Sequence, residues 1–219
     1  MTRNSPTKKA VTIGVTGNSG CGKSSVCDIL RDKGAFIIDA DKIAHDILLK
    51  DSGASGAYDE IVGVFGPGVL GAGGEIDRKR LGRVIFADDA KRGILVDITH
   101  KYIIREMLEL KEKAVKAGYA LIAMDAPLLI EAGLHSYCDG VWAVRAGYDR
   151  RLARVMRRDG LTPGDAAARL NAQTPFEELA RHATAIIENE DDDDIQDLRA
   201  QIERELDKII TRQRPVKNQ

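Results

Sequence analysis

The fold of this chain is decided by the stretch Val11-Thr12-Ile13-Gly14-Val15-Thr16-Gly17-Asn18-Ser19-Gly20-Cys21-Gly22-Lys23-Ser24. Residues 11–16 are mostly apolar and β-branched, which predicts a buried strand. Residues 17–24 fit the pattern G-x-x-x-x-G-K-[ST], in which glycines let backbone N–H groups wrap around phosphate oxygens. A helix is predicted over 24–33, and its first N–H groups favour a bound anion. The stretch therefore predicts a loop that binds a nucleoside triphosphate, most simply ATP with Mg²⁺.

Two side chains of this loop have distinct expected roles. Lys23 is expected to reach the β- and γ-phosphates, and the Ser24 hydroxyl is expected to bind Mg²⁺. The predicted nucleotide-binding residues of the loop are Asn18, Ser19, Gly20, Cys21, Gly22, Lys23, Ser24 and Ser25. A chance match to the pattern is the alternative, but this match lies between a predicted strand and a predicted helix, as the chemistry requires.

The rest of the chain predicts a parallel sheet covered by helices. A strand over 35–38 completes a strand–loop–helix–strand unit of about 30 residues, which implies parallel pairing. Further strands are predicted over 121–124, 141–144 and 185–187, and residues 42–116 are mainly helical with a glycine-rich loop at 66–74. Helices are also predicted over 148–159, 166–172 and 195–210, followed by a polar tail from Thr211. The fold class is α/β.

Composition excludes several classes of protein. The chain has 219 residues, of which 43% are hydrophobic and 31% charged, and its net charge is -1. No global field therefore attracts nucleic acid or a membrane surface. The three cysteines have no spacing typical of a disulfide framework or a zinc site, and no apolar run could cross a bilayer. We expect a cytoplasmic protein, a monomer or weak homo-oligomer, with no nucleic-acid or membrane partner.

Three carboxylates follow the ends of two predicted strands, where ligands bind in open α/β sheets. Asp39 and Asp41 follow one strand and Asp125 follows another. Each could serve as a general base or hold Mg²⁺ through water. A helix N-cap is the alternative for any one of them, because Asp is favoured there and a helix follows Asp41.

Arginines crowd a short segment, at Arg145, Arg150, Arg151, Arg154, Arg157 and Arg158. Arg154 and Arg158 are one helical turn apart and share a face, where like charges are mildly destabilising unless an anion binds between them. The triphosphate is the natural anion, and the arginines would then stabilise charge on the transferring group. The alternative is a solvated charged face. Residues 160–175 could form a lid that excludes water.

At this point the residues resemble those of the dephospho-CoA kinase family, from about Val11 to about Ile210. The matching pieces, in order, are Ile13–Gly17 with Gly22-Lys23-Ser24, Ile38-Asp39-Ala40-Asp41, Phe65-Gly66, Asp77-Arg78, Leu81-Gly82, Phe86, His100, Asp125–Glu131, Arg154, Arg158–Leu161, Arg169, Gln173 and Asn189. The resemblance implies ATP-dependent phosphorylation of the ribose 3′-hydroxyl of dephospho-CoA, giving CoA and ADP.

The resemblance also implies an organisation and further site residues. A P-loop NTPase core, a three-layer α/β/α structure with a five-stranded parallel sheet, would span 10–42, 117–149 and 176–212. A helical CoA-substrate-binding region would span 43–116, and a lid 150–175. Asp41 carries over as catalytic base, with Lys23, Arg154 and Arg158 also catalytic. Asn189 would lie near the adenine, and Ser24 and Asp125 would hold the metal. Substrate-binding residues would be Asp39, Arg78, His100, Pro127, Leu128 and Glu131.

The sequence also departs from the family pattern. Arginine is replaced by His45, proline by Lys101, phenylalanine by Ile130 and aspartate by Thr184, and an acidic run, 190–194, replaces a glycine. We interpret 191–194 as a solvated turn that caps the last helix. Alternatives therefore stay open: another small P-loop kinase acting on a nucleoside, nucleotide or sugar-like acceptor, or a nucleotide-binding regulator without catalysis. A regulatory GTPase is disfavoured, because no Asn-Lys-x-Asp stretch follows a late strand.

Overall fold

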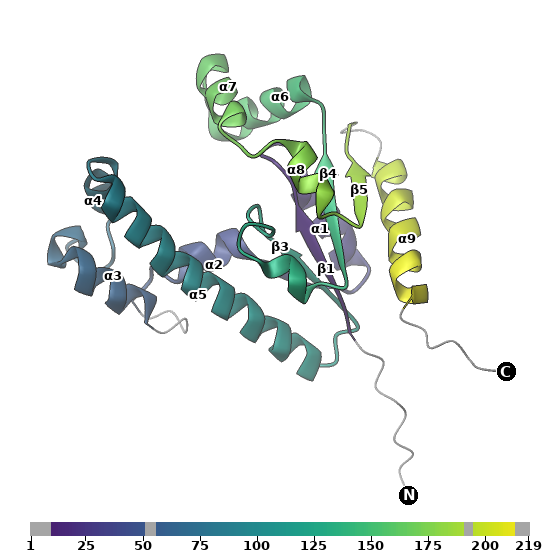
Figure 1. Cartoon of the computed structure of the whole chain (residues 1–219), viewed down its shortest axis with the longest axis horizontal. Helices are drawn as coiled ribbons and strands as arrows, with labels where there is room; N and C mark the ends of the chain where they lie inside the picture. The colour runs from purple at the N-terminus through teal and green to yellow at the C-terminus, as the bar shows by residue number, and fades with distance from the viewer. Residues whose placement is uncertain (1–9, 51–55, 191–194, 213–219) are drawn as a thin grey trace, which may run out of the picture. The chain divides into compact units, whose positions relative to one another are not determined.

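The structure, a computed structural model, describes residues 10–50, 56–190 and 195–212 (Figure 1). These residues form two compact units. One unit contains the described residues of 10–38 and 114–212, and the other contains those of 39–113. Within the described ranges, no helix is both long and apolar enough to cross a membrane. The predicted turn at 191–194 lies outside the described residues, as does the predicted tail beyond Arg212.

The first unit is built on a five-stranded sheet in the order β2-β3-β1-β4-β5. The strands are β1 (Val11–Thr16), β2 (Phe36–Asp39), β3 (Leu121–Asp125), β4 (Gly140–Arg145) and β5 (Ala185–Glu188). The β1–β3, β1–β4 and β4–β5 pairs are parallel. The predicted parallel sheet is thus confirmed, with strand ends shifted by at most one residue. Every residue of the central strand β1 is buried, which explains its mostly apolar, β-branched sequence.

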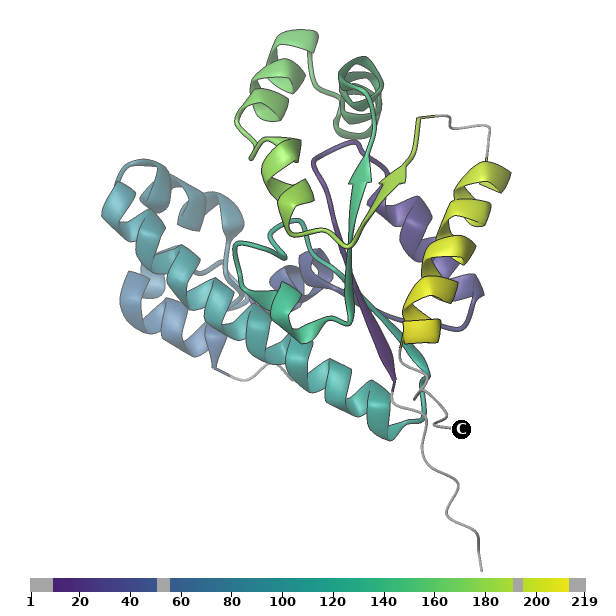
Figure 2. The ribbon, with the colours of Figure 1, turned by 45° about the vertical axis from the view of Figure 1, so that its right-hand side comes forward.

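Helices cover both faces of this sheet. On one face, α1 (Lys23–Asp32) packs with α9 (Ile195–Arg212), whose Leu198, Ile202, Leu206 and Ile209 are buried. On the other face, α8 (Phe176–Arg181) packs on β4 (Figure 2). The three-layer prediction is confirmed, although α8 itself was not predicted. The predicted tail begins too early, because Thr211 and Arg212 complete α9.

Two helices lie beyond the carboxyl ends of β4 and β5 (Figures 1 and 2). They are α6 (Tyr148–Asp159) and α7 (Pro163–Asn171), and they share a small core of Val155, Ala166 and Leu170. The predicted start of α7 at Ala166 is late, because Thr162 caps the helix and Pro163 occupies its first position.

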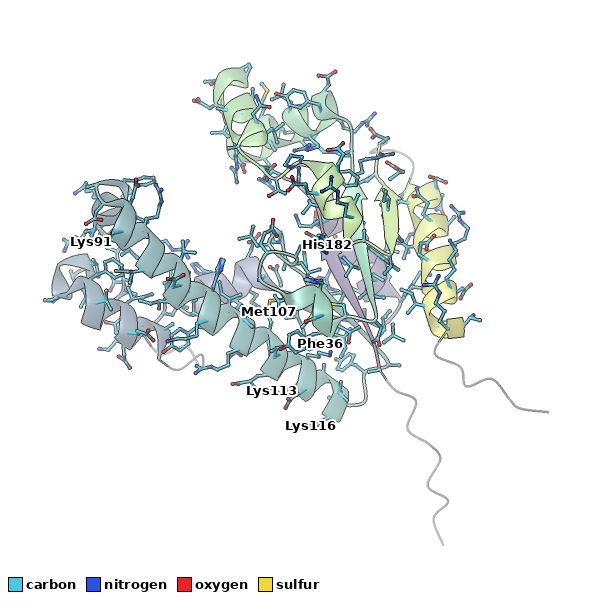
Figure 3. All side chains as sticks on the ribbon, viewed as in Figure 1. Phe36, Lys91, Met107, Lys113, Lys116 and His182 are labelled. Carbon is cyan, nitrogen blue, oxygen red and sulfur yellow. The ribbon has the colours of Figure 1, made fainter. Side chains whose placement is uncertain are left out.

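The second unit is helical, as predicted for most of its length. Its elements are α2 (Ala40–Asp46), α3 (Ala57–Phe65), the short 3-10 helix η1 (Pro67–Val69), α4 (Arg78–Phe86) and most of α5 (Asp89–Lys116). Met107, labelled in Figure 3 on α5, is fully buried. The assignment of this unit to CoA binding stays a prediction.

Candidate active site

The loop between β1 and α1 has the backbone that phosphate binding requires. Gly17, Gly20 and Gly22 all have positive φ angles, of 146°, 78° and 88°. Gly22 precedes α1, and no side chain caps the first turn of this helix. Lys23 opens the helix, and its Nζ donates a hydrogen bond to the Gly17 carbonyl at 3.0 Å. The lysine is therefore folded back over the loop, at the position where a phosphate would accept from it.

None of these three glycines can be replaced without displacing a neighbour, and at Gly17 a Cβ would lie 2.6 Å from the backbone oxygen of Val144. A Cβ on Gly20 would lie 2.6 Å from the backbone oxygen of Arg151, and a Cβ on Gly22 would clash with the Asn189 side-chain amide. The loop glycines thus serve close approach as well as backbone conformation.

Asn189 holds the loop from behind. It follows β5, is 6% exposed, and its Nδ2 donates to the Cys21 carbonyl at 3.0 Å. The Arg154 guanidinium donates to the Gly20 and Asn189 carbonyls, both at 3.1 Å. The structure therefore brings Asn189 and Arg154 to the glycine loop, and their predicted contact with a nucleotide stays a prediction.

A second arginine of α6 connects the loop to the segment after α7. Arg151 Nε donates to the Ser19 carbonyl at 3.0 Å, and its Nη2 donates to Gln173 Oε1 at 3.2 Å. That Gln173 oxygen also accepts from the Ser19 N–H, at 3.0 Å. Asn18 Nδ2 donates to the Thr174 carbonyl at 3.0 Å. Thr174 escaped the sequence analysis, because a backbone carbonyl carries no signal in the residue type.

Arg158 has a different environment from Arg154. Its guanidinium donates to both carboxylate oxygens of Asp159, at 2.7 and 2.8 Å, and Arg169 Nη1 donates to the same carboxylate at 2.7 Å. These hydrogen bonds hold the pKa of Asp159 below its usual value. A shared anion between Arg154 and Arg158 stays a prediction. The helical spacing alone did not reveal that Arg158 has an acidic partner, Asp159.

Asp125 ends β3 beside the loop. It is in register with Val15 of β1, and the Cys27 thiol of α1 is hydrogen-bonded to its carboxylate. Burial raises the pKa of Cys27 strongly, and the Asp125 charge raises it further. Burial also raises the pKa of Cys21. Ser24, the second residue of α1, is exposed. No group of three or more possible metal-ligating side chains occurs in the described part of the chain. A metal here would rely on phosphate and water for most of its ligands.

The turn after β3 lies at the same sheet edge. The Thr16 hydroxyl donates to the Pro127 carbonyl at 3.1 Å, and Glu131 Oε1 accepts from the Thr174 hydroxyl at 3.2 Å. Leu128 is 48% exposed, whereas Leu129 is fully buried. The turn that carries Pro127, Leu128 and Glu131 therefore contacts β1 through Thr16 and the segment after α7 through Thr174. Both of these lie next to the glycine loop or contact it.

A cavity of about 540 Å³ lies beside α6, whose Arg154 contacts the glycine loop. It is lined by Gly147, Tyr148, Asp149, Arg150, Ala153, Arg154, Arg157 and Glu190. Arg154 belongs to this cavity and also contacts the loop, so a ligand in the cavity would be adjacent to phosphates on the loop. Within this lining, Arg150 Nε and Glu190 Oε2 form an ion pair at 3.9 Å.

In the second unit, Asp39 at the end of β2 and Asp41 in the first turn of α2 differ in their contacts. Asp39 caps α2, and its Oδ1 accepts from the N–H groups of Asp41 and Lys42 at 2.9 and 3.0 Å. The Asp41 side chain is exposed and has no hydrogen bond or ion pair with any described residue. His45 and Arg78 contact each other, and His100 is half-buried within α5. The cap alternative therefore holds for Asp39, while Asp41 keeps a carboxylate available for chemistry.

Known proteins match this chain over most of its length. A family model described as dephospho-CoA kinase matches residues 11–194. A dephospho-CoA kinase of Geobacillus kaustophilus is 40% identical over 179 residues, which cover 82% of this chain and 88% of the relative. A solved dephospho-CoA kinase from Campylobacter jejuni is 31% identical, with a TM-score of 0.67, covering 93% of this chain and 98% of that one.

A crystal structure of the protein TT1252 from Thermus thermophilus is also similar. It is 31% identical, has a TM-score of 0.73, and the match covers 91% of this chain and 97% of that one. The sequence resemblance, the loop geometry and these matches agree. The chain belongs to the dephospho-CoA kinase family.

Proposed function

We propose that this protein transfers the γ-phosphoryl group of ATP to the ribose 3′-hydroxyl of dephospho-CoA, giving CoA and ADP. Family membership supports this reaction over that of another small P-loop kinase. The observation that carries it is the glycine loop, with Lys23 over it and Asn189 and Arg154 behind it. A cytoplasmic location, and a monomer or weak homo-oligomer, remain our expectations.

The loop binds and orients the triphosphate. Its backbone N–H groups and the uncapped first turn of α1 donate to phosphate oxygens. Lys23 exchanges its bond to the Gly17 carbonyl for bonds to the β- and γ-phosphates. Arg154 would add positive charge as the phosphoryl group transfers. It also lines the adjacent cavity, to which we assign the nucleoside end of ATP. Arg158 pairs with Asp159, so we propose that it contacts the triphosphate only after the lid segment, residues 150–175, moves.

Ser24 and Asp125 are the residues that would hold Mg²⁺. Hydroxyl, carboxylate and water oxygens suit this ion, which keeps several waters in kinase sites. Bound Mg²⁺ neutralises charge on the β- and γ-phosphates. Asp125 fits the role because its carboxylate lies at the base of the loop, close enough to shift the pKa of Cys27.

Asp41 is the general base of the proposal. It accepts the proton of the attacking hydroxyl while the γ-phosphoryl group departs from ADP. Its lack of a described partner suits this role, and Asp39 instead fixes the first turn of α2. The distinction between the two aspartates rests on these contacts.

The reaction is tested by ADP release in a coupled assay with a panel of acceptors. We expect turnover with dephospho-CoA and little with nucleosides or sugars. Turnover only with another acceptor would favour a different small P-loop kinase. Asp41→Asn should lower kcat by about 10²–10⁴-fold and leave ATP affinity unchanged. Unaltered kcat in this variant would remove Asp41 from the mechanism without removing the reaction. If the wild-type protein bound ATP but turned over none of the acceptors, a non-catalytic regulator would be favoured.

A further inference from the structure

One contact in the second unit links two residues of the predicted acceptor side. The Arg78 guanidinium, through Nη2, contacts His45 Nδ1. An arginine side chain has donors and no acceptor, so Nδ1 must accept and the imidazole proton lies on Nε2. Both side chains are exposed. The pair therefore presents one ring N–H and the remaining guanidinium N–H groups to solvent, all of them donors.

The neighbouring charges do not neutralise Arg78. Asp77, the preceding residue, accepts hydrogen bonds from the N–H groups of Lys79 and Arg80 at 2.8 and 3.1 Å, and it pairs with the Arg80 guanidinium at 3.5 Å. Arg80 also donates to the Leu70 carbonyl at 2.6 Å. Within 10–50, 56–190 and 195–212, no carboxylate forms an ion pair with Arg78. Of the two arginines that open α4, Arg80 is engaged and Arg78 is available to an anion.

The pair is also positioned relative to the proposed base. Asp41 and His45 lie four residues apart on α2, so they share a face, with about 5–6 Å between their Cβ atoms. A ribose has a comparable width: its 3′-hydroxyl lies on one side and the carbon that bears the 5′-phosphate on the other. An alcohol at Asp41 and a 5′-linked phosphate at His45 and Arg78 can therefore belong to the same nucleoside.

We propose that His45 and Arg78 together bind the diphosphate group of the acceptor. This inference rests on the proposed function, because it names the part of dephospho-CoA that the pair recognises. Arg78 supplies a charged, planar donor set that matches phosphate oxygens, and His45 adds the Nε2 donor. His45 acts as a positioning residue as well, because its Nδ1 fixes the orientation of the guanidinium.

The test separates this inference from the reaction itself. Wild-type protein must first turn over dephospho-CoA; if it does not, the proposed function fails before any variant is made. In Arg78→Ala, the KM for dephospho-CoA should rise about 10- to 100-fold, with the KM for ATP and kcat changed less than about twofold. His45→Ala should raise the same KM by a smaller factor. His45→Gln should restore part of the loss, because its amide can both accept and donate.

Lys79→Ala is the matched control, because it removes one positive charge from the same turn of α4. Its KM for dephospho-CoA should stay within about twofold of wild type. An equal rise of this KM in Lys79→Ala would mean that the effect comes from the general positive charge of this turn and not from a specific site, and it would contradict the inference. Inorganic pyrophosphate, added at saturating ATP, should compete with dephospho-CoA in the wild type and compete more weakly in Arg78→Ala. Equal behaviour of the two proteins toward pyrophosphate, or an unchanged KM in Arg78→Ala, would overturn the inference.

Discussion

Replacing Gly22 by alanine tests how the loop is built, and Gly34 supplies a matched control. The two glycines have nearly equal φ angles, 88° and 85°, so an added Cβ imposes the same backbone penalty at both, about 1–2 kcal/mol. They differ in what the Cβ meets. At Gly34 there is nothing within 4 Å, whereas at Gly22 the Cβ clashes with the Asn189 amide.

The expected difference between the two variants can be worked from the Asn189 contacts. If the amide moves, its hydrogen bond to the Cys21 carbonyl at 3.0 Å is lost inside a buried site, which costs about 1–3 kcal/mol. Gly34→Ala should therefore lower the free energy of unfolding by about 1–2 kcal/mol and Gly22→Ala by about 2–5 kcal/mol.

Urea denaturation, followed by circular dichroism, measures both values, and the KM for ATP provides a second readout. Gly22→Ala should raise this KM, because the loop must shift, while Gly34→Ala should leave it unchanged. Equal losses of stability in the two variants would refute the reasoning, since the Asn189 contact would then contribute nothing. Loss of ATP affinity in Gly34→Ala would refute it as well.

Three further predictions address the supports of the loop and the α6–α7 pair. Arg151→Lys should raise the KM for ATP about tenfold, because lysine cannot contact Ser19 and Gln173 together; kinetics at saturating acceptor measure this. The buried Cys27 thiol, with its raised pKa, should be alkylated by iodoacetamide at pH 8 at least about ten times more slowly in folded than in urea-unfolded protein, as followed by mass spectrometry. Asp159→Asn should speed amide exchange in α6 and α7 at pH 6. Because the pKa of Asp159 is lowered in the folded state, its stabilising contribution is present above its ordinary pKa and is lost as the pH falls through the lowered value, so the exchange rates of the two proteins should converge once the pH is below that lowered value.

The parts of the fold that were predictable are those with a repeating or composite signal. The buried strand at 11–16 and the glycine loop could be read directly, because continuous apolar runs and phosphate-binding loops constrain residue type at many positions. α9 was predictable from its apolar spacing. In contrast, α8 is only six residues long and follows Pro175, so its pattern was too short to separate from a loop.

The site was predictable where the chemistry depends on side-chain type. Lys23, Asn189 and Arg154 could be named, and the structure brings them together. The contacts made by backbone carbonyls, such as those of Ser19 and Thr174, depend on chain path alone and leave no trace in composition. The contrast between Asp39 and Asp41 was also hidden, because both residues are favoured near a helix start and only the cap hydrogen bonds distinguish them.

The bond between Lys23 and the Gly17 carbonyl affects what nucleotide binding can contribute to stability. The ammonium group has an acceptor within the loop itself, so a phosphate that binds here replaces an existing partner instead of satisfying a vacant donor. The net gain at this residue is the difference between a charge-assisted bond to phosphate and one to a neutral carbonyl. This bond lies within the loop and does not depend on a nucleotide, so ADP can leave after each turnover without the β1–α1 connection having to refold.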